Sequence, residues 1–182
     1  MTAPMPQQGT PAEFLKSRIR EVPDFPKPGI NFYDITTLLR NPEGFKTAID
    51  SLAAPFAGAR IDIVVGIESR GFILGGAVAD RLGAGFCPIR KPGKLPAKTL
   101  RESFSLEYGT DAIEIHVDAI QPGQRVLVID DVLATGGTAK AAASLVKRLG
   151  GTLHGLAFLI ELDFLNGREK LPGEQVTSVL QY

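Results

Sequence analysis

The chain has 182 residues, with 20 basic and 20 acidic side chains, and 44% of its residues are hydrophobic. This length and composition suit one globular domain with a sizeable core, and the balanced charge argues against a broad nucleic-acid-binding surface. No stretch approaches the ~20 apolar residues that span a bilayer. A single cysteine, Cys87, excludes an intrachain disulfide, and its apolar surroundings favour a buried side chain over a reactive thiol.

The chain begins with MTAPMPQQGTP, which has neither the basic nor the apolar region of a secretory signal. We therefore expect a disordered tail over residues 1–11 and a cytoplasmic protein. PAEFLKSRIREV follows with the apolar spacing of a short helix. PDFPKPGINFYD is too rich in proline and glycine for regular structure. Asn41 and Pro42 then predict the start of another helix.

Apolar runs alternate with helical patterns through the rest of the chain. The expected strands are RIDIVVGI, GFCPIRK, RVLVID, TLHGLAFLIEL and VTSVLQY, and IEIHV suits a hairpin or edge strand. RGFILGGAVADRLG and TAKAAASLVKRLG read as helices, whereas PGKLPAKTLRESFS reads as a long basic loop. This order predicts an α/β fold with a mostly parallel sheet, whose ligands bind beyond the carboxyl ends of the strands. The informative loops therefore follow Ile67, Lys91 and Ile129.

The loop after the expected strand Arg125–Ile129 carries the strongest functional signal. Asp130 and Asp131 come directly after the strand, and small and hydroxyl residues follow at Ala134, Thr135, Gly136, Gly137 and Thr138. Unpaired N–H groups at a helix start, approached closely through glycines, suit a phosphate. The two carboxylates would repel that phosphate, but they can accept hydrogen bonds from sugar hydroxyls. A phosphorylated ribose satisfies both halves of the loop, whereas the alternative is a capped helix beside solvated carboxylates.

The string IDDVLATGGT resembles the phosphoribosyl-pyrophosphate (PRPP) signature of type I phosphoribosyltransferases, in which the acidic pair binds ribose hydroxyls and the loop binds the 5′-phosphate. DFPKPGINFYDITTLL, GIESRGFILGGAVA, RKPGKLP and SLEYGTDAIEIHVDAI are similar to members that act on adenine, and the similarity runs from about Pro23 to the carboxyl terminus. It implies the family's α/β fold: a twisted, mostly parallel sheet flanked by helices, a small amino-terminal hood and a flexible lid loop. One domain would span residues 1–182, with the base-binding hood segment at 22–40.

The same resemblance implies a reaction of purine salvage, in which adenine and PRPP give AMP and pyrophosphate. It implies Mg²⁺ bound through PRPP rather than by protein ligands, and the two isolated histidines make no metal site of their own. It also implies a homodimer with small-molecule substrates and neither a nucleic-acid nor a membrane partner. Two alternatives stay open: a phosphoribosyltransferase for a 6-oxopurine (hypoxanthine, guanine or xanthine), and a non-catalytic regulator that senses PRPP.

For the pyrophosphate, the resemblance points to Glu68, Ser69 and Arg70, with a cis peptide bond expected between Glu68 and Ser69. The alternative for Arg70 is a surface cation that pairs with Glu68. A polyanionic leaving group also needs cations as its bond breaks. Arg90, Lys91 and Lys94 match the family's RKxGKLP pattern for that role. The alternative is a solvated loop, to which the nearby Lys98 and Arg101 fit equally well.

The expected lid would keep water from a reactive ribosyl cation. Glu107 and Tyr108 follow it, and the resemblance places this glutamate near N7 of the base, where it would move a proton. The alternative for Glu107 is an ordinary surface glutamate. For adenine itself, the resemblance implies main-chain contacts at Asn31 and Tyr33 and stacking on Phe32. Tyr33 stands where many relatives carry arginine.

We predict that Glu107→Gln slows turnover more than it weakens adenine binding, because the amide cannot accept the proton that the carboxylate would take. Steady-state kinetics with varied adenine separates the two effects. Unaltered turnover would return Glu107 to the role of a surface residue.

Overall fold

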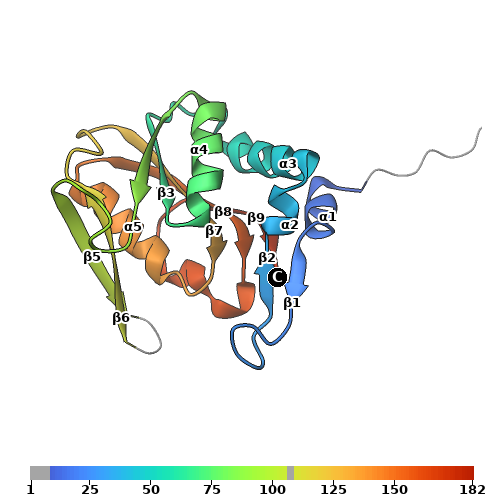
Figure 1. The fold of residues 1–182 in the computed structure, drawn as a ribbon. Helices are drawn as coiled ribbons and strands as arrows, with labels where there is room; N and C mark the ends of the chain where they lie inside the picture. Colours follow the sequence, from blue (N-terminus) through green and yellow to red (C-terminus); the bar gives the residue numbers. More distant parts are fainter. Residues whose placement is uncertain (1–8, 106–108) are drawn as a thin grey trace, which may run out of the picture. The chain divides into compact units, whose positions relative to one another are not determined.

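The computed structural model describes residues 9–105 and 109–182, and its chain falls into two compact units, Met1–Ser51 and Leu52–Tyr182. Figure 1 follows the order of the elements along the chain. The expected lid residues Glu107 and Tyr108 lie outside the described residues, as does most of the expected tail.

The first unit contains two short strands and helices on either side of them. Its elements in order are α1 (Pro11–Lys16), β1 (Arg20–Val22), β2 (Phe32–Asp34), α2 (Thr36–Leu39) and α3 (Pro42–Ala53), the last of which runs past the unit boundary. Thr10 and Glu13 form a capping box at the start of α1. Pro11, the last residue of the expected tail, is the first residue of this helix. The amide of Gly44 donates to Asn41 Oδ1 at 2.7 Å, which confirms the predicted helix start.

Two expectations for this unit were wrong. The helix predicted over PAEFLKSRIREV ends at Lys16, and Arg20–Val22 forms β1 instead. The proline-rich segment is not irregular throughout, because Phe32–Asp34 forms β2 and pairs antiparallel with β1. Proline restricts only its own and the preceding residue, and the last proline of the segment lies four positions before β2.

The second unit is built on a five-stranded parallel sheet in the order β4-β3-β7-β8-β9 (Figure 1). The strands are β3 (Ile63–Ile67), β4 (Gly85–Ile89), β7 (Arg125–Leu133), β8 (Thr152–Glu161) and β9 (Val176–Gln181). Helix α4 (Arg70–Leu82) joins β3 to β4, and α5 (Gly137–Arg148) joins β7 to β8. The connection from β3 to β4 and the connection from β7 to β8 run toward opposite edges of the sheet. Because such connections are right-handed, α4 and α5 cover opposite faces of the sheet. The predicted α/β fold is therefore confirmed.

Short 3-10 turns complete the unit: η1 (Ala54–Phe56), η2 (Asp163–Leu165) and η3 (Gly167–Lys170). The central strand β7 is buried along most of its length, and its apolar side chains join a core with β3, α5 and β8. It continues past the predicted end at Ile129 as far as Leu133. Asp130 and Asp131 thus lie within the strand, because residues 130–133 still pair with β8.

The predicted long basic loop was also wrong in its second half. Thr99–Ser105 forms β5, which pairs antiparallel with β6 (Thr110–His116), as the hairpin expected for IEIHV requires. Leu100 and Phe104 are half-buried and pack against the core, with Glu102 between them on the same face of the strand. Because most residues around Leu100 and Phe104 are polar, the sequence does not show the alternation of apolar and polar residues that identifies a strand. The irregular loop is therefore limited to residues 90–98.

Within the described parts of the chain, no helix is long and apolar enough to cross a membrane.

Cys87 is buried in β4, as expected, and burial raises the pKa of its thiol to about 12. We predict that the native protein does not react with a thiol-specific disulfide reagent at about pH 8, because neither the thiolate nor access is available. One thiol per chain should react after unfolding in urea. Absorbance of the released thiolate measures both, and rapid reaction of the folded protein would contradict the assignment.

Candidate functional site

The candidate site lies at the carboxyl ends of the neighbouring strands β3 and β7. The chain leaves β3 toward β4 at one edge of the sheet and leaves β7 toward β8 on the other side. Such a switch point opens a crevice at the carboxyl ends of the strands in parallel α/β sheets. Glycine at position 71 lets the start of α4 approach the end of β7: a Cβ there would lie 2.9 Å from Asp130 Oδ1 and 3.0 Å from the Ile129 carbonyl oxygen. The fold therefore brings the loop after β3 and the acidic end of β7 together, although they are about sixty residues apart in sequence.

Residues Ala134–Thr138, which join β7 to α5 and include the first two residues of that helix, are the predicted phosphate-binding turn and are called the phosphate turn below. It lines a pocket of about 70 Å³ together with Val132, Leu133 and Ala139. Gly136 has φ +77°, a conformation that favours glycine, and α5 begins at the next residue. The amides of the first helical turn have no partner within the helix. A small pocket at a helix start suits one compact anion.

The two aspartates differ in their surroundings. Asp131 is 6% exposed and pairs with Arg70, whose Nε donates to Oδ2 of the carboxylate. Burial, and next the negative charge of Asp131, raises the pKa of Asp130. The Asp131 amide also donates to Asp130 Oδ1 at 2.9 Å. One carboxylate is thus neutralised by a cation, and its neighbour is favoured in the protonated form.

Arg70 accordingly forms an ion pair with Asp131. The expected cis peptide bond between Glu68 and Ser69 is confirmed. Arg70 thus stands at the junction between the loop after β3 and the acid pair of β7.

The Glu68 carboxylate accepts hydrogen bonds from three residues of the loop after β4. Lys94 Nζ donates to this carboxylate at 2.6 Å, Arg90 Nε at 3.1 Å and the Lys91 amide at 3.1 Å. The hydrogen bond from Lys94, followed by those from Arg90 and Lys91, lowers the pKa of Glu68 to about 2 against the effect of burial. The sequence predicted both Glu68 and these cations as pyrophosphate ligands, but not that the cations pair with the carboxylate. Glu68 lies two residues before the start of α4 and more than twenty residues before these cations, so no local pattern identifies it as their partner.

The remaining cations of this region point elsewhere. Lys91 Nζ forms an ion pair with Asp111 at the start of β6. Lys98 and Arg101 are not among the partners of Glu68, and Arg101 is exposed on β5. The structure thus brings Arg90 and Lys94 together and turns Lys91 toward the hairpin, where it ties the loop to β6.

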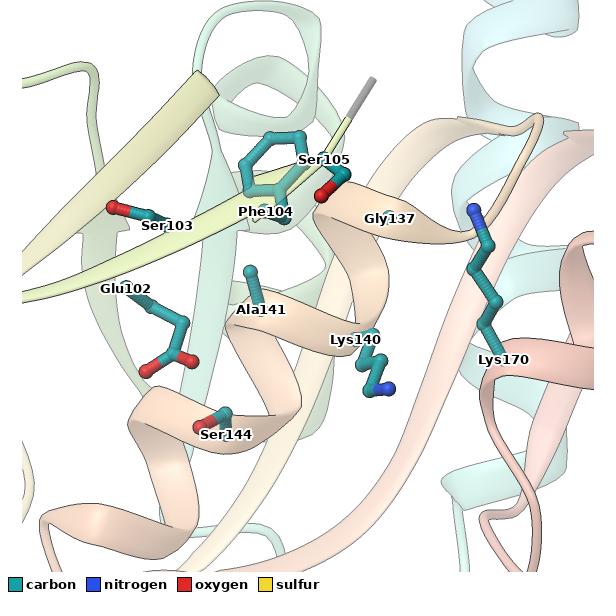
Figure 2. Close-up of a pocket in the computed structure, with 9 residues that line it drawn as sticks. All are labelled: Glu102, Ser103, Phe104, Ser105, Gly137, Lys140, Ala141, Ser144 and Lys170. Atoms are coloured by element: carbon teal, nitrogen blue, oxygen red, sulfur yellow. The ribbon is translucent and has the colours of Figure 1, made fainter. Parts of the chain in front are cut away.

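The end of β5 lies beside the start of α5. A Cβ at Gly137 would lie 3.1 Å from the Phe104 ring. Figure 2 shows Phe104, Ser105 and Gly137 together at one end of a cavity of about 410 Å³ between β5 and α5. The β5–β6 hairpin therefore leads from the sheet to the region of the phosphate turn, and Glu107 and Tyr108, beyond the described residues, follow Ser105 within three positions.

The predicted base-binding residues belong to the first unit. Asn31 precedes β2, and its Nδ2 donates to Glu21 Oε2 at 3.1 Å. Phe32 meets Phe25 edge to face, with 5.3 Å between the ring centroids, and Tyr33 pairs with Glu21 across the β1–β2 ladder. Phe32 is partly exposed. A short strand that fixes the backbone at 32–34 can present main-chain donors and acceptors at set positions.

Among residues 9–105 and 109–182, no three His, Cys, Asp or Glu side chains form a group that could hold a metal ion.

Comparison with known proteins agrees with this geometry. Residues 34–178 match the phosphoribosyl transferase domain family. The parallel sheet, the phosphate turn and this match define a phosphoribosyltransferase of type I fold.

Closer relatives narrow the class. The chain is 59% identical over 177 residues to the adenine phosphoribosyltransferase of Acidobacterium capsulatum, covering 97% of this chain and 98% of that protein. It is 61% identical over 168 residues to the enzyme of Koribacter versatilis, covering 92% of each. The solved adenine phosphoribosyltransferase of Rhodothermus marinus is 60% identical with a TM-score of 0.90, over 94% of this chain and 98% of that one. The chain belongs to the adenine phosphoribosyltransferase family.

The depressed pKa of Glu68 predicts a pH-dependent contribution to stability. Because the folded pKa, about 2, lies below the ordinary value of 4.5, the contribution is present above that ordinary value and is lost as the pH falls toward 2. The difference in urea midpoint between the wild type and Glu68→Gln should therefore shrink from about pH 6 to about pH 3. Glu169→Gln, at an exposed glutamate, is the matched control. A difference that does not change with pH would contradict the ion-pair assignment.

Proposed function

We propose that this protein transfers the 5-phosphoribosyl group of PRPP to adenine, giving AMP and pyrophosphate. The observation that carries the proposal is the phosphate turn at the end of β7, beside an acid pair and the loop of Arg70, at the switch point of the sheet. Relatives about 60% identical over nearly the whole chain are adenine phosphoribosyltransferases. A solved relative from Saccharomyces cerevisiae, 43% identical, is described in complex with an imino-altritol bisphosphate and adenine.

In this proposal the 5′-phosphate occupies the phosphate turn, where residues Ala134–Thr138 supply amides and two hydroxyls. The ribose 2′- and 3′-hydroxyls donate to Asp130 and Asp131. A protonated Asp130 can also donate a hydrogen bond to a sugar oxygen, and the raised pKa of this residue supports that role. The positive charge of Arg70 offsets one of the two carboxylate charges beside the phosphate.

The pyrophosphate needs cations at the other end of the sugar. Arg70 is held by Asp131 and Lys94 by Glu68, so each can exchange a carboxylate for a pyrophosphate oxygen when PRPP binds. Ser69 and Arg90 complete this group, with Lys91 at its edge. As the bond from C1′ to pyrophosphate breaks, its electron pair leaves with the pyrophosphate, and these cations stabilise the growing charge.

Adenine attacks C1′ through N9 as that bond breaks. Glu107 takes the proton from N7, and Tyr108, its neighbour in the chain, is the second residue of this catalytic pair. Asn31 and Tyr33 hold the base through main-chain groups, and Phe32 stacks on the ring. The hood segment at 22–40 thus supplies the base contacts within one catalytic domain.

The proposal includes Mg²⁺, a homodimer and a cytoplasmic location, all implied by the family resemblance. Mg²⁺ keeps most of its waters and binds phosphate oxygens readily, so PRPP itself would carry the ion. Bound there, it would neutralise charge on the leaving pyrophosphate.

One assay tests the proposal. The protein is incubated with PRPP and Mg²⁺ and with each of adenine, hypoxanthine, guanine and xanthine, and the nucleotide formed is identified by chromatography. We expect AMP, from adenine. Exclusive formation of a 6-oxopurine nucleotide would assign the sister activity, and the absence of any nucleotide would favour a non-catalytic PRPP-binding protein.

We predict that Asp131→Asn raises KM for PRPP by about tenfold or more, because a hydrogen bond to a charged acceptor is lost. The KM for adenine should change little. Asp62→Asn is the matched control, since the Asp62 carboxylate accepts from the Arg125 amide at 2.8 Å at the opposite end of the sheet. Initial rates with varied PRPP measure the effect, and an unchanged PRPP saturation curve would refute the role of Asp131.

A further inference from the structure

An ion pair between a buried glutamate and a partly exposed arginine lies directly behind the phosphate turn. Glu161, at the end of β8, is 3% exposed and pairs in register with Leu133 at the end of β7. Its carboxylate accepts from Arg168 Nε at 2.6 Å and from Nη2 at 2.7 Å, which is a two-pronged contact. Such a pair is geometrically specific and among the stronger hydrogen-bonded contacts in proteins.

Arg168 lies in η3 and has a third anchor. Its Nη1 donates to the Val176 carbonyl oxygen at 2.9 Å, at the start of β9. The hydrogen bonds that Arg168 donates to Glu161 raise the pKa of Arg168. Burial acts to raise the pKa of Glu161, but the hydrogen bonds from Arg168, Ser178 and Gln181 outweigh it and lower that pKa. Both groups therefore stay charged at neutral pH, and the short η3 segment is fixed to β8 and β9.

The backbone of η3 touches the phosphate turn at its first residue. A Cβ at Gly167 would overlap the Ala134 carbonyl oxygen, and a Cβ at Gly136 would overlap the Gly167 carbonyl oxygen. Two backbone segments are thus packed without side chains between them. The Leu162 amide also donates to the Leu133 carbonyl oxygen at 3.0 Å, just before the turn. Any shift of η3 must move the phosphate turn or open a gap beneath it.

We propose that Arg168 and Glu161 are positioning residues for the 5′-phosphate: their ion pair holds η3 against the phosphate turn and so sets where the turn's amides point. This inference rests on the proposed function only in naming the group that the turn binds. Neither residue touches the anion. A turn of glycines and small residues has little stiffness of its own, so its shape must come from what it packs against.

The test uses ribose 5-phosphate, which carries the phosphate and the diol but neither pyrophosphate nor base. Its affinity for the full-length protein is measured by titration calorimetry. Arg168→Met should weaken binding by about tenfold, by analogy with the loss of a hydrogen bond to a charged partner. Arg168→Lys, which keeps the charge but only one prong, should fall between Met and the wild type. If Arg168→Met does not fold, Arg168→Lys carries the test.

Two further variants separate positioning from stability. Ile61→Ala opens a cavity at the amino end of the sheet, where Ile61 is 5% exposed, and should lower Tm while ribose 5-phosphate affinity stays unchanged. Gly167→Ala keeps the ion pair but adds a methyl group that displaces the Ala134 carbonyl, and should weaken ribose 5-phosphate binding as Arg168→Met does. In kinetics, the Arg168 variants should raise KM for PRPP with little change in KM for adenine.

The inference is overturned if folded Arg168 and Gly167 variants bind ribose 5-phosphate as the wild type does. It is also overturned if Ile61→Ala loses as much ribose 5-phosphate affinity per degree of lost Tm as the Arg168 variants do. Failure of the proposed function has a different signature: wild-type protein that forms no nucleotide from any purine base, while ribose 5-phosphate affinity still depends on residue 168.

Discussion

The site depends on a conflict between like charges, because the groups suited to the sugar are acids and the rest of the ligand is anionic. The structure resolves this conflict locally. Asp131 is balanced by Arg70, and Asp130 has a raised pKa that favours its neutral form. Glu68 in turn holds Lys94 and Arg90. The cations that the proposed function assigns to the pyrophosphate are therefore held in place by carboxylates.

Close backbone packing is the second requirement. Gly71 lets the start of α4 reach the end of β7, and the contact between Gly136 and Gly167 seats the phosphate turn on η3. Each contact joins segments that follow different strands of the same sheet. The carboxyl ends of β3, β7 and β8 must therefore lie level with one another along the strand direction. Only then can the loop of Arg70, the acid pair and the phosphate turn contact one ligand. The register of the parallel strands sets the positions of these ends, as in the pairing of Leu133 with Glu161.

The hairpin of β5 and β6 is anchored at both of its strands. Leu100 and Phe104 anchor β5 on the core, while Lys91 pairs with Asp111 at the start of β6. The anchored part ends beside Gly137, at the start of α5.

Much of the fold and part of the site could be predicted from the sequence, because they depend on local patterns. The apolar runs and glycine stops predicted the strands and helices of the α/β sheet, and the string from Asp130 to Thr138 predicted a phosphate turn beside an acid pair. The polar residues around Leu100 and Phe104 hid β5, and the pairing of residues 130–133 with β8 extended β7 beyond its apolar run. Both depend on contacts that the local pattern does not contain.

What the sequence by itself determined is the kind of chemistry, since residue type sets which groups can accept sugar hydroxyls, surround a phosphate or balance a pyrophosphate. Only the tertiary structure decided the partners: Arg70 with Asp131, and Lys94 with Glu68. The physical reason is range. A side chain's chemistry is a property of one residue, whereas an ion pair between segments far apart in the chain exists only after the sheet has placed their ends at one edge.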